Sequence, residues 1–180
     1  MGRIEAILLA AGYSSRMGRL KSLLPIGGTT VIRRQAEVLD GLTDRTIVVT
    51  GYRGDEVEAH LSGSRVTTVR NQAFAEGMFT SVKAGILALD QEVSAFLILP
   101  VDYPLVTRSL IEDLIEEFHH SGAPVLYPSF SMRKGHPPVI SAACIPDILS
   151  YQGDAGLKGA LTPFNSEAEY FSAEDETCII

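Results

Sequence analysis

Short apolar runs alternate along the chain with segments whose apolar residues recur at helical spacing. Strands are predicted at Ile4–Leu9, Thr46–Thr50, Val66–Val69, Ala95–Leu99, Ala123–Tyr127 and Pro138–Ile140. Helices are predicted at Val31–Leu39, Asp55–Leu61, Phe79–Leu89 and Thr107–His120, with Thr30 and either Thr107 or Ser109 as caps. This alternation is typical of a mostly parallel sheet covered on both faces. We therefore expect one α/β domain over residues 1–180, with a Rossmann-like, three-layer architecture.

The charge of the chain narrows the range of partners. Its 180 residues carry a formal net charge of −7, which argues against binding to nucleic acid or to an anionic membrane surface. The dense basic cluster is Arg16, Arg19 and Lys21, a size that suits a triphosphate rather than a polymer. A small anionic ligand is therefore expected at this cluster.

The cysteines and the apolar start of the chain indicate the compartment. Cys144 and Cys178 have no nearby Cys or His at a metal-ligand spacing, and two cysteines suggest no disulfide framework. The apolar run from Ile4 to Ala11 is far shorter than the roughly 20 residues that span a membrane. We expect a cytoplasmic protein that does not enter a membrane.

The loop after the first predicted strand, LLAAGYSSRMGRLKS from Leu8 to Ser22, follows neither common phosphate-binding pattern. Five residues separate Gly12 from Gly18, where a P-loop has four, and the dinucleotide pattern G-x-G-x-x-G is absent. Small residues here would still let the backbone approach a phosphate-bearing ligand closely, and Arg16 and Lys21 would supply fixed positive charge. The alternative is a surface loop with incidental cations.

The pattern L-A-A-G-x-S-x-R-M-G-x-x-K in this loop resembles the nucleotidyltransferases of the molybdenum cofactor family, especially the molybdopterin cytidylyltransferases. The resemblance implies that Arg16 and Lys21 act on the triphosphate during catalysis. L-A-A-G, rather than L-A-G-G, favours CTP over GTP. The residues implied to contact the nucleotide are Leu9, Ala10, Ala11, Gly12, Ser14 and Ser15.

The segment LILPVDYPLV places Asp102 where a central strand is expected to end. A carboxylate at this end of a parallel strand can hold Mg²⁺ against phosphates, and the resemblance assigns the metal-binding Asp to the same position. The alternative is a turn residue that caps the loop before the next helix. We expect Asp102 to be both the Mg²⁺ ligand and a catalytic residue.

A second segment, NQAFAEGMFTS, resembles the part of the family that frames the base and ribose. The resemblance implies nucleotide contacts from Asn71, Gly77 and Ser81. Gly77 and Met78 would open a helix, with Ser81 in its first turns. The alternative is an ordinary helix start with Met78 and Phe79 in the core.

Two later segments resemble the side of the family site that receives the second substrate. In RKGHPPVI the implied residues are His136 and Pro137, although His136 could equally be a loop histidine whose hydrogen bonds are satisfied. In GDAGLKGAL they are Asp154 and Lys158, with lysine at a position where the family has arginine. A lysine keeps the charge but loses the two-pronged geometry of a guanidinium.

The final residues, EDETCII, resemble the family just before its acidic segment D-I-D-T-P-E-D. Cys178–Ile180 are therefore expected to form the strand that precedes that segment. The domain over residues 1–180 would then be truncated at its C-terminus and would lack a second acidic metal ligand.

The resemblance implies transfer of CMP from CTP to a phosphate monoester such as molybdopterin, with release of pyrophosphate and with a molybdoenzyme as a further partner. Two alternatives stay open. One is a nucleotidyltransferase that acts on a sugar or alcohol phosphate, and the other is a non-catalytic module that binds a nucleotide or a pterin.

Overall fold

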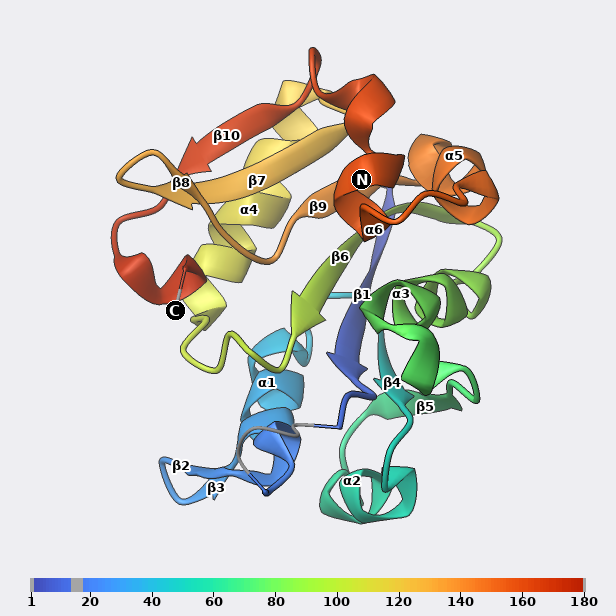
Figure 1. Cartoon of the computed structure of the whole chain (residues 1–180). Helices are drawn as coiled ribbons and strands as arrows, with labels where there is room; N and C mark the ends of the chain where they lie inside the picture. Colours follow the sequence, from blue (N-terminus) through green and yellow to red (C-terminus); the bar gives the residue numbers. More distant parts are fainter. Residues whose placement is uncertain (1, 14–17, 180) are drawn as a thin grey trace.

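The computed structural model describes residues 2–13 and 18–179, and it has a central sheet between two sets of helices (Figure 1). The sheet order is β10-β7-β9-β6-β1-β4-β5, with β8 paired to β7. Its strands are β1 (Arg3–Ala10), β4 (Arg45–Thr50), β5 (Val66–Arg70), β6 (Val93–Pro100), β7 (Val125–Phe130), β8 (Arg133–Lys134), β9 (Val139–Ser141) and β10 (Glu169–Ser172). A separate two-stranded hairpin is formed by β2 (Pro25–Ile26) and β3 (Thr29–Thr30).

The sheet has a parallel half and a mixed half. β1 pairs in parallel with β4 and β6, and β4 pairs in parallel with β5. β9 is antiparallel to both β6 and β7, while β10 is parallel to β7. The arrowheads of β1, β4 and β6 point to the same end of the molecule in Figure 1. The carboxyl ends of these strands therefore converge, which is where open α/β sheets bind ligands.

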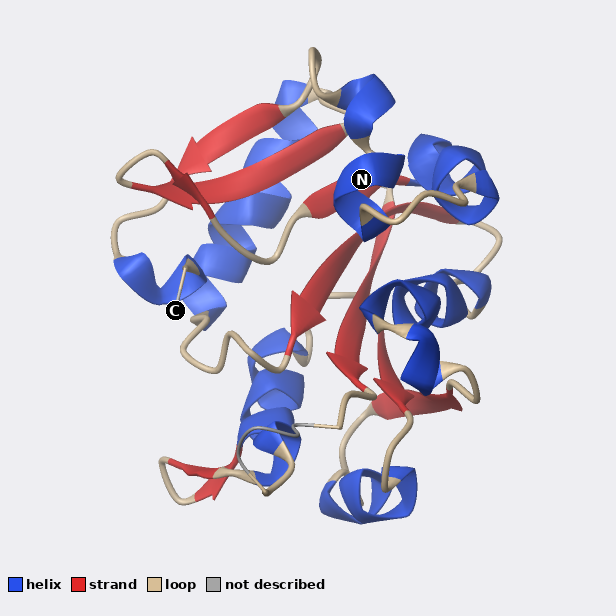
Figure 2. Cartoon of the chain, in the orientation of Figure 1, coloured by secondary structure: helices blue, strands red, loops and turns tan. Residues whose placement is uncertain are grey.

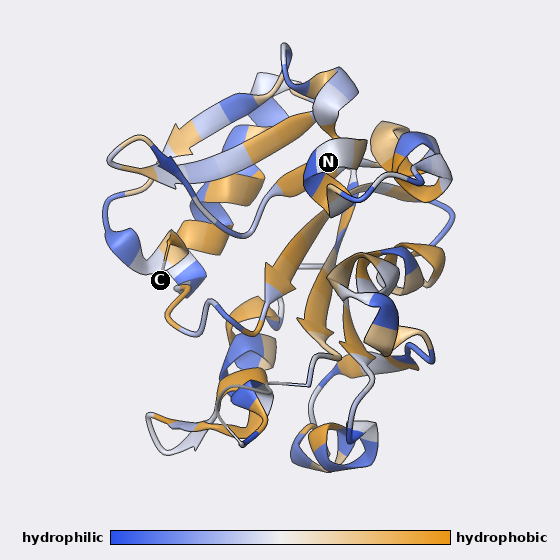
Figure 3. Ribbon diagram, in the orientation of Figure 1, coloured by the Kyte–Doolittle hydropathy of each residue, from blue (hydrophilic) through white to orange (hydrophobic). Residues whose placement is uncertain are grey.

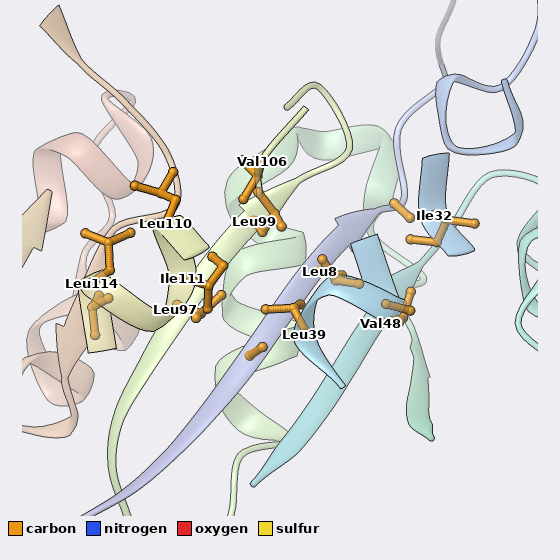
Figure 4. Packing of buried hydrophobic residues seen from close by; sticks show 14 of the residues in the cluster. Leu8, Ile32, Leu39, Val48, Leu97, Leu99, Val106, Leu110, Ile111 and Leu114 are labelled. Carbon is orange, nitrogen blue, oxygen red and sulfur yellow. The ribbon is translucent and has the colours of Figure 1, made fainter. Parts of the chain in front are cut away.

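Helices cover both faces of the sheet because β1 is apolar on both sides. Ala6, Leu8 and Ala10 face one cluster of buried side chains, whereas Ile7 and Leu9 face the other. The first cluster includes residues of α1 (Val31–Leu39), α2 (Gly54–His60) and α4 (Arg108–Ser121); the second includes residues of α3 (Met78–Leu87), α5 (Ile145–Ser150) and α6 (Gly156–Ala160). Figure 3 shows the central strands as the most hydrophobic part of the chain, and Figure 4 shows α1 and α4 side chains packed on the first face.

A glycine lets α3 lie close to the sheet. A Cβ atom at Gly85 would lie only 2.5 Å from Cγ2 of Ile7 and 3.2 Å from Cγ2 of Val49. Any larger residue would push the helix away from β1 and β4. The C-terminal half of α3 is therefore packed directly against β1 and β4, and the start of the same helix borders the site described below.

The predicted α/β class, the mostly parallel sheet and the covering of both faces are confirmed. Thr107 caps α4 by accepting a hydrogen bond from the backbone N–H of Leu110. The predicted Thr30 cap is wrong: Thr30 precedes α1, but its side chain makes no capping hydrogen bond. The predicted Phe79–Leu89 helix ends two residues early, at Leu87.

The prediction of a strand at Cys178–Ile180 is also wrong for its described part. Glu176–Cys178 form a 3₁₀ turn, in which Asp175 accepts hydrogen bonds from the N–H and the hydroxyl of Thr177. This local capping favours a turn over extension. The elements β2, β3, β8, β10, α5 and α6 were not predicted from the sequence, and Figure 2 shows where they lie around the predicted ones.

Within the described ranges, no helix combines the length and the apolar character needed to cross a bilayer.

Candidate active site

A cleft of about 320 Å³ opens at the carboxyl ends of β1 and β6, beside the start of α3. It is lined by Leu9, Ala10, Ala11, Gly12, Tyr13, Lys21, Ser22, Phe74, Ala75, Gly77, Met78, Ser81, Pro100, Val101 and Asp102. Three segments far apart in the sequence therefore form one surface. Its size falls at the lower end of the range for small-molecule sites, about 300–1,000 Å³.

The end of β1 forms the floor of the cleft. The carbonyl of Leu9 accepts a hydrogen bond from Val101 N–H, and that of Ala11 accepts one from Tyr52 N–H. A Cβ atom at Gly12 would meet no atom within 4 Å. Packing within the protein therefore does not require glycine there, and the missing side chain leaves room on the cleft side.

Ser14, Ser15 and Arg16 lie outside the described residues, so the roles expected for them stay predictions. Lys21, the other expected cation, is described and lines the cleft at the start of a 3₁₀ turn, Lys21–Leu23. Ser22, its neighbour, also lines the cleft and is buried.

Lys21 and Asp102 meet across the cleft. The Lys21 ammonium nitrogen lies 2.7 Å from Oδ1 of Asp102, and both side chains are about two-fifths exposed. An ion pair this exposed contributes little to stability. It does place a cation and a carboxylate side by side where the strands converge.

The carboxylate among the described lining residues, that of Asp102, is compatible with a Mg²⁺ site completed by substrate phosphates. Mg²⁺ is commonly held by one or two carboxylates together with substrate phosphates and water. Asp102 on the cleft wall can supply one such oxygen. Over residues 2–13 and 18–179, no three His, Cys, Asp or Glu side chains gather in a way that could enclose a metal. The donors therefore fit an ion bound jointly by Asp102 and a triphosphate.

Gly77 and Ser81 line the cleft, whereas Asn71 does not. The Asn71 amide donates to the hydroxyls of Thr80 and Ser81, at 2.8 and 2.9 Å, and its oxygen accepts from Ala73 N–H at 2.9 Å. Asn71 therefore ties the loop before α3 to the first turn of that helix. In this arrangement it orients Ser81 toward the cleft from behind.

The four residues expected on the second-substrate side do not line the cleft. Asp154 and Lys158 are exposed near α6, and Pro137 is buried. His136 lies closest, because its ring stacks on that of Tyr103, the residue after Asp102, with centroids 4.2 Å apart. Its backbone N–H donates to the carbonyl of Cys178.

The environment of His136 keeps its ring neutral. The pKa of His136 is lowered to about 4, chiefly by burial; the nearby charge of Asp102 opposes this shift, and that of Lys134 adds to it. The ring atom Nδ1 is buried and has no hydrogen-bond partner within the described part of the chain. At neutral pH His136 therefore contributes an uncharged aromatic surface behind Asp102.

Tyr13 and Phe74, together with Tyr52, form an aromatic cluster that sequence reasoning did not assign to the site. The Tyr13 ring lies 5.0 Å from that of Tyr52 and 5.2 Å from that of Phe74, centroid to centroid. Tyr13 and Tyr52 are both exposed. An aromatic residue directly after the small residues of the opening loop was the available signal.

Met78, Ala75, Pro100 and Val101 also line the cleft without having been predicted to do so. The sequence reading of Met78 left a core position open, yet its side chain is exposed. Apolar walls around a few polar groups are typical of nucleotide and cofactor sites.

Such a cleft at the strand ends of an α/β sheet, with a cation and a carboxylate facing each other, fits the class of nucleotide-binding transferases. The family model of the MobA-like NTP transferase domain matches residues 6–169. The chain therefore belongs to the MobA-like NTP transferase family and is a nucleotidyltransferase of that family.

Relatives agree with this assignment over most of the chain. The molybdenum cofactor cytidylyltransferase of Escherichia coli is 32% identical, over the whole of this chain and 90% of that protein. A nucleotidyl transferase from Methanothermobacter thermautotrophicus superposes with a TM-score of 0.81 at 28% identity, covering 96% of this chain and 88% of that one. Rv0371c of Mycobacterium tuberculosis in complex with manganese shares the fold, with a TM-score of 0.75 at 20% identity over 95% and 88% of the two chains.

Proposed function

We propose that this chain transfers CMP from CTP to a phosphate monoester such as molybdopterin and releases pyrophosphate. The observation that carries the proposal is the Lys21–Asp102 pair, 2.7 Å apart on the wall of the cleft at the strand ends. The choice of CTP and of a pterin acceptor is supported by the L-A-A-G sequence at Leu9–Gly12 and by the name of the Escherichia coli relative.

In the proposed reaction, a phosphate oxygen of the acceptor attacks the α-phosphorus of CTP. The new P–O bond forms as the bond between the α-phosphorus and the bridging oxygen breaks, and pyrophosphate leaves with that electron pair. The reaction needs no protein nucleophile, so the residues act by positioning and by electrostatics.

The proposal gives each described residue of the cleft a role that its position supports. Gly12 leaves room for the nucleotide, and Gly77 and Ser81 border it from the start of α3. Lys21 neutralises charge that builds up on the phosphates, together with Arg16 as implied by the resemblance. Asp102 would hold Mg²⁺, which supplies positive charge against the phosphate oxygens. The manganese complex of the fold relative supports a divalent ion in this role.

The second-substrate roles of His136, Pro137, Asp154 and Lys158, and the nucleotide-binding role of Asn71, remain part of the proposal. We also propose that residues 1–180 act as one nucleotidyltransferase domain in the cytoplasm, with a molybdoenzyme as the recipient of the product. The free Cys144 and Cys178 thiols support a reducing compartment.

The test is pyrophosphate release from CTP, GTP, UTP and ATP, each with molybdopterin, with a sugar phosphate, with an alcohol phosphate or with no acceptor. We expect release only with CTP and molybdopterin, and only when Mg²⁺ is present. Glu112→Gln, at an exposed acid on α4, is the matched control for Asp102→Asn and should behave as the wild type. Release with a sugar or alcohol phosphate instead would transfer the proposal to that acceptor, and nucleotide binding without release would favour the non-catalytic alternative.

A further inference from the structure

We infer that Gln35, in the middle of α1, is a positioning residue that fixes the turn carrying Asp102. The inference rests on the proposed function, in which Asp102 holds the divalent ion. Gln35 does not line the cleft and would touch neither nucleotide nor metal. It would act through the backbone of the turn.

The turn that carries Asp102 is short and sharply defined. β6 ends at Pro100, and the N–H of Tyr103 donates to the carbonyl of Pro100 at 3.2 Å. Pro100–Tyr103 are therefore the four residues of a β-turn, with Asp102 in its third position. The Asp102 side chain is 43% exposed, and its ion pair with Lys21 is exposed as well and therefore weak. The backbone of the turn thus sets the position from which the carboxylate reaches the cleft.

Gln35 is hydrogen-bonded to both ends of this turn. Its Nε2 atom donates to the carbonyl of Pro100 and to that of Tyr103, each at 3.0 Å. Both acceptors are carbonyl oxygens, so only the NH₂ end of the amide can satisfy them, and its two N–H groups are both used. One side chain therefore links the first and last residues of the turn to α1.

The burial of Gln35 indicates that its contribution to the structure lies in these two hydrogen bonds. It is 1% exposed and lies on the face of α1 that otherwise buries Val31, Ile32, Ala36 and Leu39. Its Oε1 atom is buried and accepts no hydrogen bond from any residue that the structure describes. Burying an unpaired amide oxygen is costly, and an apolar residue of similar size would avoid that cost. What glutamine adds is the pair of donors to the turn.

The neighbouring Arg34 provides a matched control. Its Nε atom donates to the carbonyl of Pro104 at 3.1 Å, one residue beyond the turn. Arg34→Met thus removes a hydrogen bond between the same helix and the same loop, but leaves both ends of the turn tied to Gln35. Gln35→Met removes both bonds to the turn while keeping the length and the unbranched shape of the side chain.

The experiment measures three properties of the full chain: amide hydrogen exchange at residues 101–103, Mn²⁺ binding in the presence of CTP by electron paramagnetic resonance, and the Mg²⁺ concentration for half-maximal turnover. For Gln35→Met we expect faster exchange at the turn and a rise of about tenfold in both metal constants, as is usual when a partner of a metal ligand is lost. The KM for CTP at saturating Mg²⁺ should change less than about twofold. Arg34→Met should change none of these values by more than that.

A double variant separates positioning from a general loss of structure. In an Asp102→Asn background, Gln35→Met should weaken Mn²⁺ binding no further, because the ligand through which it acts is already gone. Additive losses would overturn the inference, as would unchanged exchange at residues 101–103. If Gln35→Met does not fold, Gln35→Leu, which also removes the NH₂ group and places no charge at this buried position, is subject to the same criteria.

The exchange measurement also keeps the two proposals apart. If the wild-type chain transfers no nucleotide, the proposed function fails while exchange at the turn still decides whether Gln35 fixes it. If the wild type is active and Gln35→Met has wild-type metal constants, only the role of Gln35 fails.

Discussion

The parallel half of the sheet brings predicted site residues together in one cleft, whereas the mixed half does not. In the parallel half, the ends of β1 and β6 and the start of α3 bring Leu9–Gly12, Gly77, Ser81 and Asp102 to one cleft. In the mixed half, His136 and Pro137 stand between β8 and β9, away from the cleft lining. Asp154 precedes α6 and Lys158 lies on it; this helix packs against α3, but neither residue lines the cleft. Parallel strands that start together also end together, so residues at their ends must converge. Antiparallel pairs place successive loops at opposite ends, so the pairing of the mixed half does not bring His136 and Pro137 to the cleft.

Asp102→Asn gives the largest expected effect and tests the parallel half directly. The amide keeps the size of the side chain but removes the charge that would hold Mg²⁺. We expect kcat/KM to fall by a factor on the order of 10²–10³ with little change in the melting temperature, since the ion pair with Lys21 is exposed. Steady-state kinetics and thermal unfolding measure the two quantities. Near wild-type turnover would remove Asp102 from the reaction.

Lys21→Ala comes next. Its ammonium group is expected to act mainly when negative charge builds up on the transferring and leaving phosphates. We expect kcat/KM to drop about a hundredfold, with a smaller loss of CTP affinity measured by titration calorimetry. An equal loss in affinity and in kcat/KM would instead assign Lys21 to ground-state binding.

Gly12→Val and Gly85→Ala form a contrasting pair. A side chain at Gly12 meets no protein atom, so the fold should survive, while the added methyl groups occupy the cleft and weaken CTP binding by about tenfold or more. Gly85→Ala should instead lower the free energy of unfolding by about 1–3 kcal/mol, because its Cβ would press on Ile7. Denaturant unfolding and CTP titration are measured for both variants. Equal losses of stability and of CTP affinity in the two variants would contradict this assignment.

His136→Asn gives the smallest effect and tests the mixed half. The folded chain holds the pKa of His136 near 4, below the ordinary value of 6.5, so the unfolded chain binds the extra proton first as the pH falls. Stability should therefore be lost between about pH 6.5 and pH 4, by roughly 1–2 kcal/mol from pH 7 to pH 5. In His136→Asn the unfolding free energy should lose that part of its pH dependence. A curve parallel to the wild type would mean that the ring is not desolvated.

Sequence patterns were most accurate for strands that are buried on both faces. β1 is buried apart from its first residue, Glu5 included, and it was predicted to within one residue at each end. β10 escaped prediction because Glu169–Ser172 is a largely exposed edge strand without an apolar run. α6 escaped because Gly156 and Gly159 lower the helix propensity of a five-residue segment.

For the site, charged residues that lie near the strand ends could be picked out from the sequence, but the buried residues that support them could not. Asp102 stands out in the sequence as an acidic residue after an apolar run, and Lys21 as part of a basic cluster in the loop after the first strand. The pairing of Gln35 with the Asp102 turn joins residues 65 and 68 positions apart, which no local pattern reveals. The sequence signal for this contact was that Gln35 is a polar residue on the apolar face of a predicted helix.

The close approach at Gly51 bears on how this pocket could be redesigned. A Cβ atom there would lie 2.7 Å from Cβ of Phe74 and 2.8 Å from the carbonyl oxygen of Ala11, so the backbones around the cleft leave no slack at that point. Tyr13 and Met78, by contrast, line the cleft with exposed side chains. Variation of the pocket should therefore be better tolerated at Met78, on the exposed rim, than at Gly51, where any side chain would force the surrounding backbone apart.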